Sequence, residues 1–104
     1  MRADGALNLL GLAMRARGVA SGEFMTENSV KSGKSFLVIV AKDASDNTKK
    51  QFSNMCEYYK VPYREYSDKE SLGHAIGKQF RASCSVTNEN LAMEITKKID
   101  GGSN

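Results

Sequence analysis

At 104 residues with a formal net charge of +3, the chain is long enough for one domain around a single hydrophobic core, and its basic excess permits a polyanionic partner without demanding one. No apolar run approaches the roughly 20 residues that cross a bilayer, and the first residues, M-R-A-D-G, lack the apolar centre of a signal peptide. We therefore expect a cytoplasmic protein with no membrane partner, made of one domain over residues 1–100 and a frayed tail over 101–104.

Helical periodicity, capping residues and apolar runs predict helices and strands that alternate along the chain. The predicted elements, in chain order, are a helix over about residues 4–15, an extended piece around 19–20, a helix from 21 or 22 to about 32, a central strand over 36–41, a helix from 45 or 46 to 59, a short strand over 61–66, a helix capped by residue 67 and stopped by residue 77, a strand over 80–86, and a helix from 87 or 88 to 99. This order predicts the α/β class, as a three-layer α/β/α sandwich around a mixed sheet of about four strands.

The strand expected over residues 80–86 alternates between two kinds of side chain. Phe80, Ala82, Cys84 and Val86 share one face, and Arg81, Ser83 and Ser85 share the other. Cys84 thus falls on the apolar face, and Cys56 falls on an apolar stripe formed by residues 52, 55, 56 and 59. Their separation fits neither a metal site nor a disulfide framework, so we expect two buried free thiols.

The stretch N-S-V-K-S-G-K-S, residues 28–35, looks like a phosphate-binding loop in the wrong context. Such a loop follows a buried strand and opens a helix, whereas here a helical segment precedes Gly33 and an apolar strand follows Ser35. Asn28 also stands where the first loop glycine belongs. Gly33 is therefore interpreted as a helix stop, and a phosphate-transferring enzyme is a hypothesis to exclude.

Side-chain constellations typical of catalysis are hard to find. His74, the only histidine, lies off the apolar stripe of its helix, which favours a solvated position over a general base. Ser67 and Glu70 have the spacing of a capping box, which explains the acidic cluster at 68–70 without catalysis. We expect no enzyme activity, no catalytic residue, no bound metal and no cofactor.

Ordered stretches over nearly the whole chain resemble one known family. They are L-N-L-L-G-L-A-M-R-A at 7–16, S-G-E at 21–23, V-K-S-G-K-S-F-L-V-I-V-A-K-D-A-S-D-N-T-K-K at 30–50, C-E-Y-Y-K-V-P-Y at 56–63, S-L-G-H-A-I-G-K at 71–78 and S-V-T-N at 85–88. The set resembles kink-turn RNA-binding proteins of the ribosomal L-seven-Ae and L-thirty-e type, and specifically their small bacterial YlxQ-like branch. The α/β/α fold of that family agrees with the predicted layers.

The resemblance implies recognition of a kink-turn, an RNA duplex bent sharply at a bulge beside tandem sheared G·A pairs. In family members the start of the second helix enters the widened major groove, and a loop before the last strand covers the extruded nucleotide. A-form RNA hides its base edges in a narrow groove, so a bulge or kink is the accessible target. The free amides of a helix N-terminus suit the phosphates there.

Carried over to this chain, the first contact site begins at Gly22 and Glu23. Family RNA binders typically read G-[polar]-N-E-x-x-K, but this chain has Phe24 and Met25 at the Asn-Glu pair and Asn28 in place of the lysine. These changes leave specificity for a kink-turn open.

Helical spacing predicts that Phe24, Asn28 and Lys31 share one face, with Met25 closer to the core side together with Thr26, Ser29 and Val30. Two interpretations of Phe24 stay open. It either stacks on an unpaired base or packs against the neighbouring loop or a protein partner.

The second implied contact site is the loop G-K-Q-F-R-A-S, residues 77–83. Where family members often carry small apolar residues, this chain has Lys78, Phe80 and Arg81. Lys78 and Arg81 either contact phosphates or are solvated loop charges. Lys34, at the corner between helix and strand, is a weaker phosphate candidate.

The leading hypothesis is a monomeric, non-enzymatic protein that binds structured RNA, either a kink-turn in general or one in ribosomal RNA, in association with the ribosome or a translation factor. The alternative is a protein-interaction module that keeps the fold but has exchanged base-reading residues for an apolar patch at Phe24 and Met25.

Overall fold

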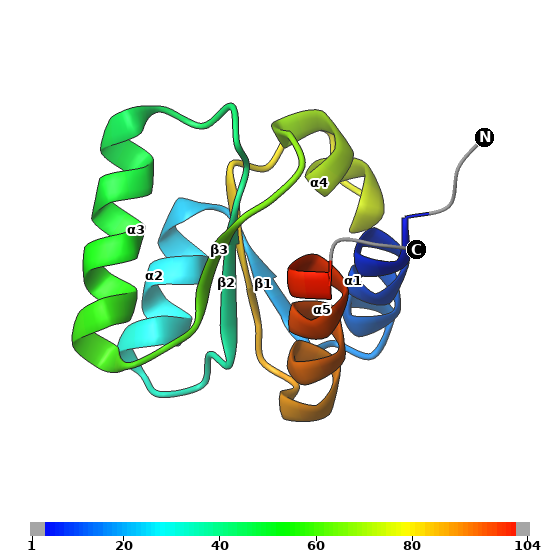
Figure 1. The fold of residues 1–104 in the computed structure, drawn as a ribbon, viewed down its shortest axis with the longest axis horizontal. Helices are drawn as coiled ribbons and strands as arrows, with labels where there is room; N and C mark the ends of the chain where they lie inside the picture. The colour runs from blue at the N-terminus through cyan, green and yellow to red at the C-terminus, as the bar shows by residue number, and fades with distance from the viewer. Residues whose placement is uncertain (1–3, 102–104) are drawn as a thin grey trace.

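The structure, a computed structural model, describes residues 4–101, and its helices and strands alternate along the chain (Figure 1). The elements are α1 (Gly5–Arg15), β1 (Val19–Ser21), α2 (Glu23–Lys31), β2 (Leu37–Val40), α3 (Asp46–Tyr59), β3 (Tyr63–Glu65), α4 (Lys69–Ala75), β4 (Ser83–Val86) and α5 (Glu89–Gly101). Each predicted element is present, with bounds shifted by a few residues. Gly101 belongs to α5 rather than to a tail, and residues 102–104 lie outside the described residues.

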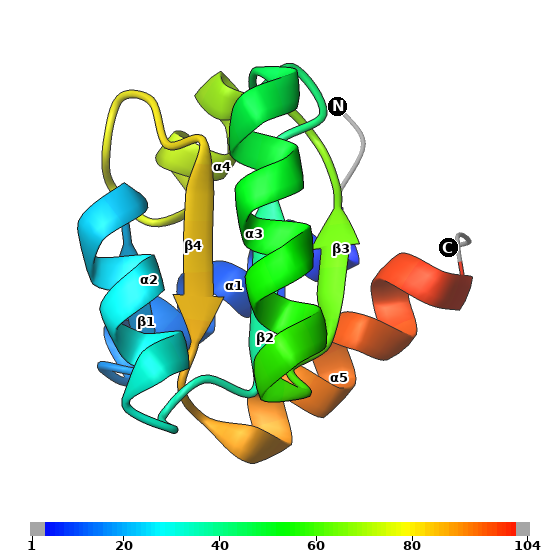
Figure 2. The same cartoon turned by 90° about the vertical axis from the view of Figure 1, so that its left-hand side faces the viewer.

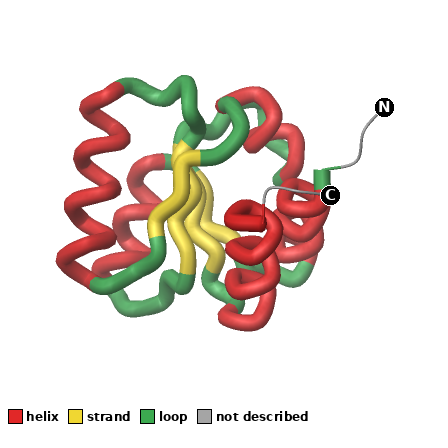
Figure 3. The backbone as a smooth tube through the Cα atoms, in the orientation of Figure 1, coloured by secondary structure: helices red, strands yellow, loops and turns green. Residues whose placement is uncertain are grey.

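The four strands form one mixed sheet in the order β1-β4-β2-β3. β4 is antiparallel to both of its neighbours, whereas β2 and β3 run parallel. Figures 1 and 3 show α2 and α3 on one face of this sheet and α1, α4 and α5 on the other. The prediction of a three-layer α/β/α sandwich with a mixed four-stranded sheet is confirmed.

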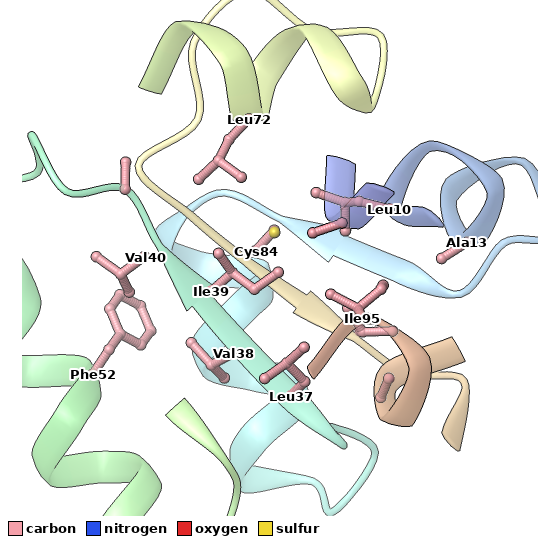
Figure 4. Close-up of a cluster of buried hydrophobic side chains, with 14 of the residues drawn as sticks. Leu10, Ala13, Leu37, Val38, Ile39, Val40, Phe52, Leu72, Cys84 and Ile95 are labelled. Carbon is pink, nitrogen blue, oxygen red and sulfur yellow. The ribbon is translucent and has the colours of Figure 1, made fainter. Parts of the chain in front are cut away.

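The core forms on both faces of the two central strands. All four residues of β2 are buried because helices cover both sides of the sheet. Figure 4 shows Phe52 of α3 against Val40 on one side, while Ile39 points toward Leu10 and Leu72 on the other. This two-sided burial explains why the sequence of β2 is a continuous apolar run rather than an alternation.

The strand predicted over residues 80–86 is shorter than expected, because only residues 83–86 pair in the sheet. Phe80 lies outside the strand and is 59% exposed. The predicted alternation of faces is present, but the hydroxyl face is also buried beneath the helix layer. There the Ser85 Oγ donates to the Ser35 Oγ at 2.7 Å, and the Ser83 Oγ lies 3.4 Å from the Thr26 Oγ1.

Two further details correct the sequence predictions. The α4 cap is Asp68, whose side chain accepts from the Ser71 amide, whereas Ser67 adopts a left-handed conformation with φ of 62°. Ser67 and Glu70 therefore do not form the predicted capping box. Tyr59 was assigned to the apolar stripe of α3, yet it is 40% exposed at the last residue of that helix.

None of the helices described between residues 4 and 101 is both long and apolar enough to cross a membrane.

Candidate nucleic-acid interface

The start of α2 is the one helix start in the described range that no side chain caps. Helices α1, α3, α4 and α5 each have a side-chain oxygen that accepts from a first-turn amide, supplied by Asp4, Ser45, Asp68 and Asn88. The α2 cap is Gly22, with φ of 90° and ψ of 163°, and it makes no such bond. The first amides of α2 are thus left to solvent or to a ligand, and they carry the positive end of the helix dipole.

Hydrogen bonds join this helix start to the loop between α4 and β4. The Gly22 amide donates to the Ser83 carbonyl at 3.0 Å, and the Arg81 Nε donates to the Ser21 Oγ at 3.2 Å. Figure 2 shows the loop passing beside the first turn of α2. The structure therefore brings the start of α2 next to the loop 77–83, two sites that the sequence analysis had assigned separately.

Glycines give the α4–β4 loop its path. Gly77, with φ of 76°, follows α4, and the amides of Gly77 and Lys78 donate to the carbonyls of His74 and Gly73, which satisfies the end of the helix. Gly73 lies so close to the loop that a Cβ there would stand 2.6 Å from the Gln79 carbonyl oxygen. The absence of a side chain at Gly73 is what lets the loop pack against α4.

Three large apolar side chains are exposed on the two joined segments. Phe24 is 76% exposed, Phe80 59% and Met25 49%. The interpretation that Phe24 packs against the neighbouring loop is therefore wrong, and its ring is free for an external partner. Met25 was expected nearer the core together with Thr26, but only Thr26 is fully buried, and about half of Met25 is exposed.

The two cationic side chains of the α4–β4 loop differ in how far they are held by hydrogen bonds. Lys78 is exposed and its ammonium makes no ion pair within residues 4–101. Arg81 is more constrained, because its guanidinium also donates to the Phe80 carbonyl at 2.8 Å. Arg81 thus links the start of α2 to the α4–β4 loop through hydrogen bonds, in addition to carrying a positive charge. Glu23, exposed in the first turn of α2, is the acidic group of this helix start.

The sequence analysis missed Lys42, which is exposed just after β2. The Lys42 amide donates to the Ser67 carbonyl, and the neighbouring Ala41 amide donates to the Ala82 carbonyl, so this residue lies at the same end of the sheet as the α4–β4 loop. The antiparallel pairing of β2 with β4 carries it there. A lysine directly after a buried strand is the pattern that could have indicated it.

The remaining predicted contacts lie farther along α2. Asn28 is exposed in the middle of the helix. Lys31 is in the last turn, where its Nζ lies 2.7 Å from the Glu27 Oε2, and Lys34 follows the helix. A helix rises about 1.5 Å per residue, so Lys31 stands roughly 12 Å along the axis from Glu23. Lys31 and Lys34 are not brought together with the other candidates.

Gly33 ends α2, and the resemblance of residues 28–35 to a phosphate loop has no structural basis. With φ of 79°, Gly33 donates to the Val30 carbonyl, and the Lys34 amide donates to the Ser29 carbonyl, the pattern of a helix C-terminus. Strand β2 follows this turn, so no helix N-terminus is available to hold a phosphate there.

The other groups considered for chemistry lie apart from each other. His74 is exposed on α4, as predicted. Both thiols are free and buried, also as predicted, and burial raises the pKa of Cys84 to about 12 and the pKa of Cys56 to about 11. Such thiols stay protonated at neutral pH and are poor nucleophiles. Within residues 4–101, no cluster of three or more histidine, cysteine or acidic residues is placed to hold a metal ion.

Known proteins share both the sequence and this architecture. Residues 4–96 match the model of the family described as the ribosomal protein L7Ae/L30e/S12e/Gadd45 family. The RNA-binding protein YlxQ of Bacillus subtilis is 40% identical over 92 residues, which make up 88% of this chain and 92% of that protein. The large ribosomal subunit protein eL8 of Thermoplasma volcanium is 30% identical over 95 residues, or 90% of this chain and 78% of that protein.

Solved structures agree with these matches. A protein of unknown function from Bacillus halodurans superposes with a TM-score of 0.91 at 35% identity, covering 94% of this chain and 99% of that one. The 15.5kD RNA binding protein of Giardia lamblia superposes with a TM-score of 0.78 at 27% identity, covering 91% of this chain and 84% of that one.

Proposed function

We propose that this chain, which belongs to the ribosomal protein L7Ae/L30e/S12e/Gadd45 family and is similar to its YlxQ members, is a non-enzymatic protein that binds structured RNA and prefers a kink-turn. The observation that carries the proposal is the uncapped start of α2, joined by hydrogen bonds to a loop with exposed aromatic and cationic side chains. Two matched relatives are named for RNA binding and one for the ribosome.

Phosphates are the first part of the proposed RNA contact. The free amides at the start of α2 offer donors and positive potential, and Lys78 and Lys42 add mobile ammonium groups at the same end of the sheet. Contacts of this kind hold the backbone in register without reading sequence. They also make affinity fall as salt concentration rises.

Stacking is the second part of the contact. A kink-turn exposes an unpaired nucleotide, and the faces of Phe24 and Phe80 are free to cover such a base. Stacking tolerates any base, whereas side-chain amides and carboxylates read particular base edges. This chain has Phe24 and Met25 where family RNA binders typically place an Asn-Glu pair, so we expect it to recognise the kinked shape more than individual guanines.

A titration of the full chain into a labelled kink-turn duplex tests this proposal. The control is the same duplex with its tandem G·A pairs replaced by Watson–Crick pairs. We expect at least about tenfold tighter binding to the kink-turn, equivalent to about 1.4 kcal/mol. Equal weak binding to both duplexes would refute kink-turn recognition, although not RNA binding itself.

The second candidate function is a protein-interaction module, in association with the ribosome or a translation factor. It is favoured by the exposure of Phe24, Met25 and Phe80, since exposed apolar side chains that gather on one surface often mark protein contacts. Affinity capture from cytoplasm, with and without ribonuclease, separates the two functions. Partners that survive ribonuclease and are lost on Phe24→Asp would support the interaction module.

A further inference from the structure

A groove with a volume of about 630 Å³ opens at the end of the sheet opposite the candidate interface. It lies where the C-terminal ends of α2 and α3 meet the first turns of α5, and Figures 1 and 2 show these three ends at the same end of the molecule. Ligand sites usually enclose roughly 300–1,000 Å³, so the size suits a bound segment or small molecule. The apolar residues that line the groove are Val30, Phe36, Tyr59, Val61, Pro62, Ala92 and Met93.

Part of this apolar lining faces solvent. Met93 is 52% exposed, Tyr59 40% and Phe36 39%, although they come from three different segments of the chain. Solvent-exposed apolar side chains that gather on a concave surface mark an interaction site more often than a single exposed residue does. Tyr59 was predicted to lie on the buried apolar stripe of α3. Its exposure is explained by its position in the lining of the groove.

The charged residues of the groove are mostly basic. Lys31, Lys60 and Lys97 line it, against the single acidic residue Glu89. Lys31 pairs with Glu27, and Lys97 lies 3.7 Å from Glu94, but neither of these carboxylates lines the groove. Exposed pairs of this kind contribute little to stability, so an incoming carboxylate can compete for both lysines.

Lys60 is the most available of the three cations. Its side chain makes no ion pair with any residue between 4 and 101. Lys60 directly follows α3 and has a left-handed backbone conformation, with φ of 62°. An apolar floor with a cationic rim is complementary to a segment that carries large apolar side chains beside carboxylates. A nucleic acid fits less well, because only two of the seven apolar lining residues, Phe36 and Tyr59, offer an aromatic face for stacking.

We propose that this groove binds a segment of a partner protein in which large apolar residues are flanked by acidic ones. The groove and the candidate RNA interface lie at opposite ends of β4: the Gly22 amide bonds to Ser83 at its start, whereas the Phe36 amide bonds to Val86 at its end. One molecule can therefore hold RNA and the acidic segment together. The groove proposal does not depend on the RNA proposal, because none of its residues is required for the RNA contact.

Selection from a random dodecapeptide phage library against the full chain tests the proposal without knowing the natural partner. Enriched peptides are synthesised with a fluorophore and titrated by fluorescence polarisation. We expect them to be rich in Asp or Glu and in Leu, Phe or Met. Saturating kink-turn RNA should leave their affinity unchanged.

Two groove variants and one matched control locate the binding. Met93→Asp should weaken peptide affinity at least tenfold, and Lys60→Asn should weaken it about threefold at low salt, since Asn tolerates the left-handed conformation of residue 60. Leu12→Asp places the same carboxylate on a helix residue outside the groove, and Leu12 is 45% exposed against 52% for Met93. This control variant should leave peptide affinity unchanged.

Three results would overturn the proposal: failure of any peptide to be enriched, enrichment of basic peptides, or equal affinity in Met93→Asp and Leu12→Asp when both remain folded by circular dichroism. Labelled oligouridine that binds the wild type and is lost in both groove variants would instead assign the groove to nucleic acid.

Discussion

At the scale of single residues, the proposed RNA contact depends on the side chains exposed around Gly22 and on what each of them can do. Phe24 offers a ring, Lys78 a mobile charge, and Arg81 a guanidinium that is already committed to Ser21 and to the loop backbone. The sequence identified these residues through family resemblance. Helical periodicity grouped Phe24 with Asn28 and Lys31, and all three are exposed, but it assigned Met25 to the core side, although Met25 is 49% exposed.

Phe24→Ala should weaken binding to a kink-turn without lowering the melting temperature. Loss of one stacked base costs about 1–3 kcal/mol, and a ring that is 76% exposed contributes little to folding. Tyr58→Ala is the control, since Tyr58 is 77% exposed but lies near the end of α3. Electrophoretic mobility shift titrations measure the kink-turn affinity of both variants. Equal affinities would show that Phe24 does not contact RNA.

Lys78→Gln should reduce the salt dependence of RNA binding. Each phosphate contact contributes about one unit to the slope of log K against log salt, so the slope should become shallower by about one. Lys97→Gln, at the opposite end of the sheet, should leave the slope as it is. A series of titrations between low and moderate salt measures both, and identical slopes for wild type and Lys78→Gln would identify Lys78 as a solvated loop charge.

At the scale of elements, sequence patterns predicted which helices and strands exist better than how they meet. Continuous apolar character identified β2, and a serine cap correctly marked the start of α3. Gly77 correctly marked the end of α4, but the start of β4 was less predictable, because tertiary contacts help to fix the loop between them. The close approach of Gly73 to Gln79 is one such contact.

Gly73→Ala should displace the α4–β4 loop and weaken RNA binding. Its Cβ would meet backbone atoms of residues 79 and 80 at 2.6 to 2.9 Å, which no side-chain rotation relieves. Overpacking of this kind costs about 1–3 kcal/mol, against about 1 kcal/mol gained from the better helix propensity of alanine. Gly101→Ala is the control, because a Cβ there meets nothing within 4 Å.

Urea unfolding and kink-turn titration of the two glycine variants are the measurements. We expect Gly101→Ala to be neutral or slightly stabilising with unchanged RNA affinity. If Gly73→Ala bound RNA as tightly as the wild type, the position of the loop would be irrelevant to recognition.

At the scale of the whole molecule, the three layers divide its surface into two ends with different properties. One end has the uncapped start of α2 and the α4–β4 loop, and the other has the apolar groove below α2 and α3. The sequence predicted the layers, but not this division. Lys31 was grouped with the RNA contacts because it shares a helix face with Phe24, and Lys34 because it lies at the corner after the helix. Both stand at the far end of the nine-residue helix α2 from Gly22.

The buried thiol of Cys84 should make the whole fold less stable at high pH. Burial raises its pKa in the folded protein from 9.0 to about 12, so above pH 9 the unfolded chain loses a proton that the folded chain keeps. Stability is therefore unaffected by this group below about pH 9 and decreases up to about pH 12, by at most about 1.4 kcal/mol per pH unit.

Urea unfolding of wild type and Cys84→Ala between pH 8 and pH 10.5, at roughly half-unit steps, measures this effect. The difference between the two slopes isolates Cys84, because burial also raises the pKa of Cys56 and Tyr66 in both proteins. We expect the loss of stability with pH to be shallower in Cys84→Ala. Parallel slopes would mean that the Cys84 thiol is hydrated in the folded state.

The most direct test of the central claim is to map a bound kink-turn duplex on the protein by amide chemical-shift changes in nuclear magnetic resonance. We predict that the largest changes fall on residues 21–28, 42 and 77–83, and that residues 59–61 and 92–97 around the groove remain unshifted. Largest changes at the groove, with the start of α2 unaffected, would contradict the account.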